Sequence, residues 1–182
     1  MDFIAGTDEV GRGCLAGPVV AAAVILKKRI DGLKDSKALS PKRRGELANT
    51  ILDNSYYGYG LVTNQKIDEI NILNASLLAM KRAILNLPIK PALVLVDGIH
   101  KPDLEISMRA IIGGDSSEDA ISAASIIAKV FRDDLMIKYE KKYPGYDFQS
   151  NKGYGTKYHL QALKDFGSCP IHRKTFKGVP TT

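Results

Sequence analysis

The sequence of 182 residues lacks the features that mark membrane, secreted and zinc-binding proteins. No apolar run approaches the ~20 residues that cross a bilayer, and the first residues lack the basic start and apolar stretch of a signal peptide. Only two cysteines are present, Cys14 and Cys169, and they do not have a metal-binding spacing. We therefore expect a cytoplasmic protein without membrane contact, in which neither cysteine forms a disulfide.

Internal repeats and low-complexity segments are also missing, and no Ser/His/Asp or Cys/His pattern favours covalent catalysis. Hydrophobic residues make up 45% of the chain and charged residues 25%, as in an ordinary globular protein. The length suits one domain with a well-buried core.

The net charge of +6 is unevenly distributed along the chain. Residues 27–44 hold eight Lys or Arg against two Asp, and residues 150–182 hold six against one Asp. Each basic segment alone is typical of a solvated surface. Two of them in a chain with clustered acids favour a polyanionic partner, and we expect that partner to be a nucleic acid.

The sequence is organised around residues 7–13, which read Thr-Asp-Glu-Val-Gly-Arg-Gly. The apolar run before them predicts a strand over residues 3–8, followed by a loop. Neighbouring residues of a regular strand point to opposite faces. Asp8 and Glu9 can therefore share one site only if the backbone turns there.

Two glycines around an arginine follow these acids. Gly11 and Gly13 permit a turn and allow another backbone or a nucleic-acid strand to approach closely. Arg12 offers a planar fork for phosphate. Acids beside such a loop suit a metal ion that meets a phosphodiester. The alternative is a surface turn that happens to be charged.

The rest of the chain alternates between strand and helix patterns. Strands are expected at residues 18–26, 56–62, 92–96 and 104–111, and helices from Ser40-Pro41 to Leu52, and at 71–87, 120–143 and 158–166. The continuous apolar run at 92–96 is typical of a central strand covered on both faces. We expect one α/β domain at residues 1–145, with a basic C-terminal part at 146–182 packed on its catalytic edge.

Acidic residues recur where predicted strands or turns end. Asp8 and Glu9 end the first strand, Asp97 ends the run at 92–96, and Asp115 follows a Gly-Gly turn. Ligands of open α/β sheets bind beyond the carboxyl ends of strands. Carboxylates that meet there suit Mg2+ or Mn2+, and two such ions can activate a water and stabilise the leaving oxygen of a phosphodiester.

Structural interpretations of the same residues stay open. Asp97 can end its strand in a turn with Gly98, and Asp115 can cap the helix after it. Four further acids are typical of helix surfaces: Glu118, Asp119, Asp133 and Asp134. The three histidines are typical of an exposed loop, a helix start and a packed tail, respectively: His100, His159 and His172.

In these residues and their surroundings the chain resembles ribonuclease HII, the type 2 ribonuclease H. The matching stretches run in family order over nearly the whole chain: residues 8–13, 17–21, 35–37, 39–44, 96–98, 114–115, 122–129, 152–156, 170–173 and 176–177. The resemblance implies a ribonuclease H-like fold, with a mixed central sheet flanked by helices and a small basic C-terminal helical or irregular part.

The resemblance also implies an activity. The family member would be an endonuclease that hydrolyses the RNA strand of RNA/DNA hybrids and cuts 5′ of single ribonucleotides embedded in duplex DNA. Two metal ions, Mg2+ or Mn2+, would support the hydrolysis, leaving a 3′-hydroxyl and a 5′-phosphate. We expect a monomer that binds these two substrates.

The roles of individual residues follow from the resemblance as well. It implies metal ligation by Asp8, Glu9 and Asp97, with Asp115 as the fourth active-site acid. Substrate contacts are implied for eight residues: Gly11, Arg12, Gly13, Ser36, Lys37, Ser125, Lys129 and Tyr154. Within this set, the Gly-Arg-Gly loop would read the 2′-hydroxyl, and Tyr154 would stack near the DNA sugar that follows.

One position departs from the family pattern, because Gly113 stands where a lysine is usual, two residues before Asp115. A phosphate contact is therefore missing or supplied elsewhere. The sequence also ends soon after Phe176, so we expect no long C-terminal tail for a protein partner.

Two other functions fit parts of the same evidence. One is a different two-metal nuclease, such as a DNA junction resolvase. The other is a nucleic-acid-binding domain without catalysis, although a pure binder gains nothing from placing four carboxylates beside phosphate.

Overall fold

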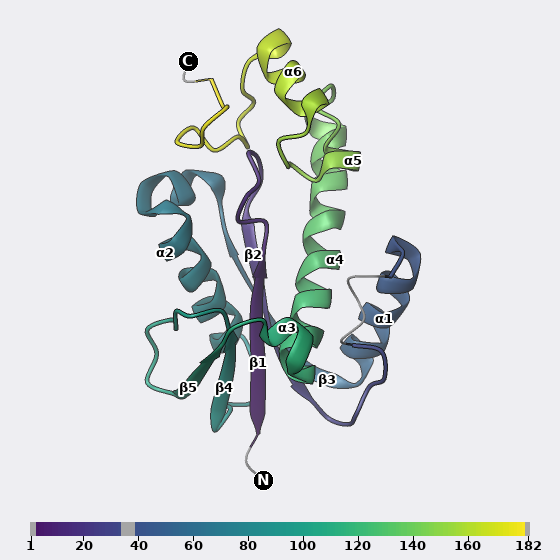
Figure 1. The fold of residues 1–182 in the computed structure, drawn as a ribbon, viewed down its shortest axis with the longest axis vertical. Coiled ribbons are helices and arrows are strands. Elements are labelled where there is room, and N and C mark those ends of the chain that lie inside the picture. Colours follow the sequence, from purple (N-terminus) through teal and green to yellow (C-terminus); the bar gives the residue numbers. More distant parts are fainter. Residues whose placement is uncertain (1–2, 34–38, 181–182) are drawn as a thin grey trace.

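The computed structural model describes residues 3–33 and 39–180 and contains a five-stranded mixed sheet between helices (Figure 1). The strands are β1 (Ile4–Val10), β2 (Val19–Leu26), β3 (Ser55–Val62), β4 (Leu93–Asp97) and β5 (Ser107–Ile111). Their order is β3-β2-β1-β4-β5. β2 runs antiparallel to both β1 and β3, whereas β4 runs parallel to β1 and β5. The expected mixed sheet with flanking helices is confirmed.

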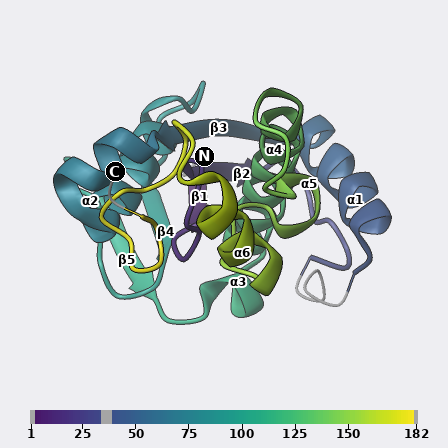
Figure 2. The same ribbon diagram turned by 90° about the horizontal axis from the view of Figure 1, so that it is seen from above.

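The helices lie on both faces of this sheet. They are α1 (Pro41–Asp53), α2 (Asn64–Leu85), α3 (Gly114–Ser117), α4 (Asp119–Lys142), α5 (Phe148–Asn151) and α6 (Lys157–Phe166). Helix α2 covers one face, and α4 with α1 covers the other (Figure 2). Separate apolar clusters fill the two interfaces, because β2 sends Ala21 and Ala23 toward α2 but Ala22 and Val24 toward α4.

The middle strand of the sheet is β1, and the apolar run at 92–96 lies in β4, which is an interior strand as expected. β4 lies second from the edge, between β1 and β5. Its residues Val94 and Val96 are nevertheless fully buried, because α2 packs over that part of the sheet. The continuous apolar run therefore reports burial of β4 and not its rank in the sheet.

Helix α2 starts seven residues earlier than the predicted range of 71–87. Thr63 caps it by accepting a hydrogen bond from the Lys66 amide. Asn71 then interrupts the helix with a left-handed backbone (φ 65°), and its side-chain oxygen accepts a 3.0 Å hydrogen bond from the Asn74 amide. The predicted start is thus the cap of the second segment, since asparagine tolerates this conformation.

The start of α1 agrees with expectation, whereas the start of β5 does not. Ser40 caps α1 and Pro41 is its first residue, as the sequence indicates. Strand β5 begins at Ser107 and not at Leu104, whose side chain packs against the core outside the strand. Within the described residues, no helix is both long enough and apolar enough to cross a membrane.

The C-terminal part packs against the loop that joins β1 to β2. A third apolar cluster joins Leu15 and Ala16 of that loop to Phe148, Leu163 and other residues after position 135. Backbone hydrogen bonds connect Leu15 to Gly153 and to Arg173, each at 2.8 Å. The end of the chain therefore lies beside the loop that follows the first strand (Figure 1, top).

The contact between α2 and β3 allows a stability test. A Cβ added to Gly60 would overlap the backbone carbonyl of Ala79, so Gly60→Ala forces α2 away from the sheet. We expect a loss of about 3 kcal/mol or more in the free energy of unfolding, measured by urea denaturation. As the control, Gly45→Ala lies in α1 with open space around it and should gain up to ~1 kcal/mol. Equal stability of the two variants would contradict the close contact.

Candidate active site

The first two acids lie within β1, and the expectation that the backbone turns there is wrong. The strand continues to Val10 because Asp8 and Glu9 pair in register with Ala22 and Ala21 of β2. Their side chains consequently leave opposite faces. Asp8 is hydrogen-bonded to Ser125 of α4, whereas Glu9 borders a cavity whose other wall is α2. The two acids flank the carboxyl end of the central strand from both sides.

Asp8 lies in a site that disfavours its negative charge. Only 7% of its surface is exposed. Burial, reinforced by the charges of Glu9 and Asp97, raises the pKa of Asp8 to about 7, although the hydrogen bond from Ser125 opposes the rise. Three carboxylates are thus close enough to repel one another, which is the arrangement that a bound cation relieves.

Asp97 reaches this place because β4 is parallel to β1. Thr7 pairs with Val96, so the carboxyl ends of the two strands meet at one edge. Gly98 follows with φ of 93°, so Asp97 is also the strand-ending residue of the alternative interpretation. Its Oδ1 atom is buried and has no hydrogen-bond partner among the described residues. A role in the turn does not explain why this buried oxygen lacks a hydrogen-bond partner, whereas a role as a metal ligand does.

The fourth acid, Asp115, lies in the first turn of α3. An added Cβ on Gly114 would lie 3.4 Å from Asp97 Oδ1, so the backbone beside Asp115 adjoins Asp97. Asp115 does not cap α4, whose N-cap is Glu118. Its backbone carbonyl instead accepts a 2.5 Å hydrogen bond from Ser122. Gly113, at the position of the usual lysine, has φ of 66°, a conformation that favours glycine.

The donor set fits a divalent cation by its chemistry. In the part of the chain that the structure describes, no three His, Cys, Asp or Glu side chains form a ready-made ligand cluster. Two other observations indicate a cation: the orphaned oxygen of Asp97, and the raised pKa of Asp8, which burial causes first and the neighbouring carboxylates reinforce. Hard divalent ions take such oxygen ligands and complete their shells with water and phosphate.

Arg12 joins the acids to the glycine loop. Its Nη1 donates a 2.9 Å hydrogen bond to Glu9 Oε1, and half of its side chain is exposed. Gly11 has φ of 91°, and a Cβ there would overlap the Arg132 guanidinium, so this position accepts only glycine. Gly13 has open space around it. The loop therefore presents a partly exposed cation and an unobstructed backbone beside the acids.

Two fully buried guanidiniums hold this loop in place. Arg173 donates to the carbonyls of Gly11 and Arg12, each at 2.7 Å, and to that of Gly17 at 3.0 Å. Arg132 donates to the carbonyls of Pro18, Ala16 and Lys152 at 2.8–3.1 Å. Burial lowers the pKa of Arg173 to about 10, so its guanidinium remains charged at neutral pH. Backbone dipoles stabilise both charges.

A chain of hydrogen bonds through two buried histidines holds the backbone carbonyl of Tyr154. The Cys169 amide donates to His172 Nδ1 at 2.9 Å, the two Nε2 atoms of His172 and His159 lie 3.0 Å apart, and His159 Nδ1 lies 2.8 Å from the Tyr154 carbonyl. These contacts assign one proton to the bond between the rings and one to His159 Nδ1. Both histidines are therefore neutral and buried, while the Tyr154 ring is 40% exposed.

The remaining expected substrate contacts are unequally placed. Ser125 faces Asp8 on α4. Lys129, one turn further, pairs with Asp133 at 2.8 Å and lies 6.0 Å from the Tyr154 ring. Ser36 and Lys37 lie outside the described residues.

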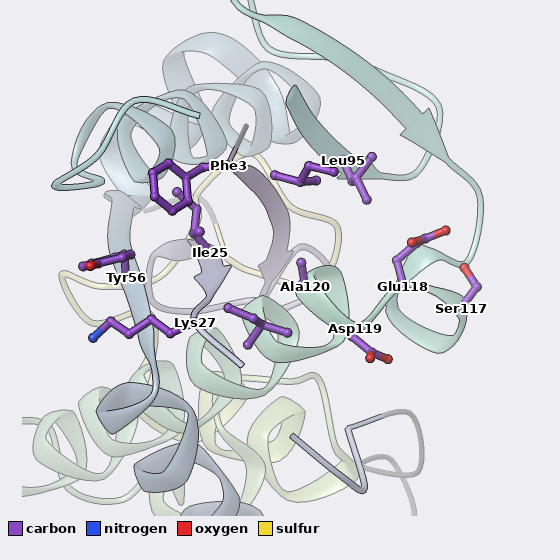
Figure 3. Close-up of a pocket in the computed structure, with 11 residues that line it drawn as sticks. Phe3, Ile25, Lys27, Tyr56, Leu95, Ser117, Glu118, Asp119 and Ala120 are labelled. Atoms are coloured by element: carbon purple, nitrogen blue, oxygen red, sulfur yellow. The ribbon is translucent and has the colours of Figure 1, made fainter. Parts of the chain in front are cut away.

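A larger cavity, of about 760 Å3, lies at the opposite end of β1 (Figure 3). Phe3, Ile25 and Tyr56 line it, together with the start of α4 at Ala120. Glu9 and Asp97 border a separate cavity of about 370 Å3 at the carboxyl end of the strand. Cavity size therefore does not locate the candidate site, whereas the convergence of charged groups does.

Sequence reasoning did not identify Arg132 or the pairing of the two histidines. A signal for Arg132 exists, because it continues the buried face of α4 that Ala124 and Ala128 begin at four-residue spacing. His159 and His172 had no such signal. Their contact depends on how the tail folds back over α6.

Comparison with known proteins identifies a family at this point. The family model for ribonuclease HII matches residues 5–179. Ribonuclease HII of Chlamydia abortus is 54% identical, with 97% of this chain and 85% of that protein covered. The structure of ribonuclease H2 from Pyrococcus horikoshii superimposes with a TM-score of 0.82 at 32% identity, covering 96% and 94% of the two chains. A structure of Bst-RNase HIII in complex with Mn2+ has a TM-score of 0.72 at 19% identity, covers 97% of this chain and 68% of that one, and shows the shared ribonuclease H-like fold.

The histidine pair predicts a pH-dependent stability. Burial first, and then the adjacent His159, lowers the pKa of His172 to about 4, from 6.5 in an unfolded chain. Between these values the unfolded state binds the extra proton, so the pair destabilises the fold by up to ~3 kcal/mol as the pH falls from 6.5 to 4. Denaturant unfolding of wild type and His172→Gln across this range should show a smaller acid loss in the variant.

The control for this measurement is His100→Gln, which removes an exposed histidine. Its acid loss should equal that of wild type. An unchanged pH dependence in His172→Gln would show that the ring is already protonated in the folded protein, and would contradict the assigned hydrogen-bond chain.

Proposed function

Since the chain belongs to the ribonuclease HII family and is an endonuclease of the ribonuclease H type, which hydrolyses the RNA strand of RNA/DNA hybrids, we propose that it also cuts duplex DNA 5′ of a single ribonucleotide. The products would be a 3′-hydroxyl and a 5′-phosphate. The observation that supports this proposal is the short, rigidly held Gly11–Gly13 loop directly after the acids of β1. Family membership favours ribonuclease H activity over a junction resolvase and over a binder without catalysis.

The acids of the site provide the ligands for catalysis. We assign the divalent metal, Mg2+ or Mn2+, to Asp8, Glu9 and Asp97, with Asp115 as the fourth acid. Two such ions, when bound, supply an activated water and charge stabilisation for the leaving oxygen. Ser125 keeps Asp8 oriented through its hydrogen bond, and the orphaned oxygen of Asp97 gains a partner.

Recognition of one ribonucleotide follows from the size and rigidity of the loop. Arg173 fixes the peptide planes of Gly11 and Arg12, so the loop presents its amides in a constant arrangement. A 2′-hydroxyl both donates and accepts hydrogen bonds, and it distinguishes RNA from DNA at one position. A hydroxyl held at the end of β1 brings its own 5′ phosphate to the neighbouring acids.

Tyr154 supplies the second half of recognition. Its exposed ring lies near Lys129, and its backbone is held by His159. We assign the ring to stacking on the sugar after the ribonucleotide, where the absent 2′-hydroxyl of DNA leaves room. The basic C-terminal part at 146–182, together with residues 27–44, would contact phosphates and set affinity without sequence preference.

The metal assignment is tested with variants that keep shape and remove charge. Asp97→Asn and Asp8→Asn should each lower the cleavage rate by about a thousandfold, because the ions supply most of the charge stabilisation. Asp134→Asn, an exposed carboxylate on α4, is the matched control and should keep the wild-type rate. Rates are measured on an RNA/DNA hybrid with and without chelator. Full activity of Asp97→Asn, or of wild type in excess chelator, would exclude this assignment.

The role of Tyr154 is tested with two substrates side by side. Tyr154→Ala should slow cleavage at a single ribonucleotide in duplex DNA, because it removes a stacking interaction worth roughly 1–3 kcal/mol. The same variant should slow cleavage of a long RNA/DNA hybrid less. Tyr158→Ala, which removes an exposed ring on α6, is the control. Equal losses on both substrates would show that Tyr154 only packs. Failure of wild type to cut at one ribonucleotide would overturn the proposed specificity, while leaving hybrid cleavage intact.

A further inference from the structure

Ser76 in the middle of α2 has an unusual environment for a serine. It is only 1% exposed, and within the described residues its hydroxyl has no hydrogen-bond partner. The other two buried serines both donate to carbonyl oxygens: Ser55 to Ile51 at 2.7 Å, and Ser122 to Asp115 at 2.5 Å. A buried hydroxyl without a partner destabilises a fold, so Ser76 requires an explanation beyond packing.

The cavity beside the acids supplies one. Four residues of α2 at helical spacing line its wall: Leu73, Ser76, Leu77 and Met80. Three of them are apolar, and Ser76 is the one polar residue among them. Glu9 and Asp97 border the same cavity from the sheet. Ser76 therefore lines the same cavity as two of the candidate ligands.

The second unpartnered buried atom of the described residues is Oδ1 of Asp97, a residue that also lines this cavity. The two orphaned atoms are chemically complementary. An ionised carboxylate only accepts hydrogen bonds, whereas a hydroxyl both donates and accepts. The cavity that both residues line has a volume of about 370 Å3, which is large enough for water molecules. One hydrated cation would satisfy both atoms, the carboxylate as ligand and the hydroxyl through a water.

We propose that Ser76 is a positioning residue of the metal site, whose hydroxyl hydrogen-bonds a water in the coordination shell of the cation held by Asp97. The inference rests on the proposed function, because it requires that metal site. Divalent ions of this class keep several of their waters, and groups that bind the outer shell of a metal affect its affinity strongly. Ser76 thus extends the site to the α2 face of the sheet.

The test is a calorimetric titration of the full chain with Mn2+ alone, without nucleic acid. Ser76→Ala should bind Mn2+ about tenfold more weakly than wild type, at the low end of losses for outer-shell groups. Ser76→Thr keeps a hydroxyl in the same place and should recover most of the affinity. Ser55→Ala, which removes a buried hydroxyl far from the acids, should bind as wild type does.

Thermal unfolding in chelator separates this role from a structural one. Removing an unsatisfied buried hydroxyl should raise the melting temperature of Ser76→Ala, whereas Ser55→Ala should melt lower because it loses a hydrogen bond. A gain in stability together with weaker Mn2+ binding is the expected signature. A structural serine would give a lower melting temperature with unchanged affinity, and that result would overturn the proposal.

Asp97→Asn in the same titration distinguishes failure of this inference from failure of the proposed function. If Asp97→Asn loses Mn2+ binding while Ser76→Ala binds as tightly as wild type, only the role of Ser76 is wrong. If Asp97→Asn binds as tightly as wild type, the metal site is wrong and the role of Ser76 is wrong with it.

Discussion

The loop between β1 and β2 is held by two buried positive charges, and the site depends on them. Arg132 and Arg173 make six hydrogen bonds to carbonyl oxygens, five of them in this loop. A loop that does not pair its backbone groups in a sheet or helix normally runs over the surface, where water molecules hydrogen-bond to those groups. Here guanidiniums replace water. The loop is therefore held rigidly directly after the acids of β1, and most of it is buried, although Arg12 and Gly13 are exposed.

This arrangement concentrates unsatisfied groups in one place. Carbonyls of the loop have partners, and so do the buried serines on β3 and α4, whereas Asp97 Oδ1 and Ser76 Oγ do not. Asp8, nearby, has a raised pKa because its charge is poorly solvated. A fold keeps such groups only where function requires them. Among the described residues, the buried side-chain atoms without a hydrogen-bond partner thus belong to residues near the carboxyl end of β1.

Much of this could be predicted from the sequence, because local patterns carry it. Alternating strands and helices, the cap at Ser40, and acids after strands that share an edge all follow from short-range rules. The path of β1 through Asp8 and Glu9 could not be predicted, since pairing with β2 decides it. The position of β4 in the sheet could not be predicted either, because it depends on pairing with β1 and β5.

Residues whose roles depend on distant contacts were the hardest to identify. Arg173 belonged to a matched stretch, but nothing local indicates that it binds carbonyls of the first loop. The sequence predicts a helix that starts at Asn71. In the structure, Asn71 is a left-handed residue between two helical segments, because α2 already begins at Asn64. Nothing in the local sequence distinguishes Ser76 from other small residues of α2. Its significance depends on the cavity that the sheet and α2 form together.

The separation between Arg173 and Gly11 has a consequence for synthesis of the chain. The two residues are 162 positions apart, and ribosomes extend chains from the N-terminus at roughly 5–20 residues per second. The acids of β1 are therefore made on the order of ten seconds or more before the residue that fixes the loop beside them. During that interval the nascent chain carries the acids of β1 without the guanidinium that orders the loop beside them. Ribosome-bound intermediates thus hold the proposed metal ligands before the loop proposed to recognise the 2′-hydroxyl is fixed.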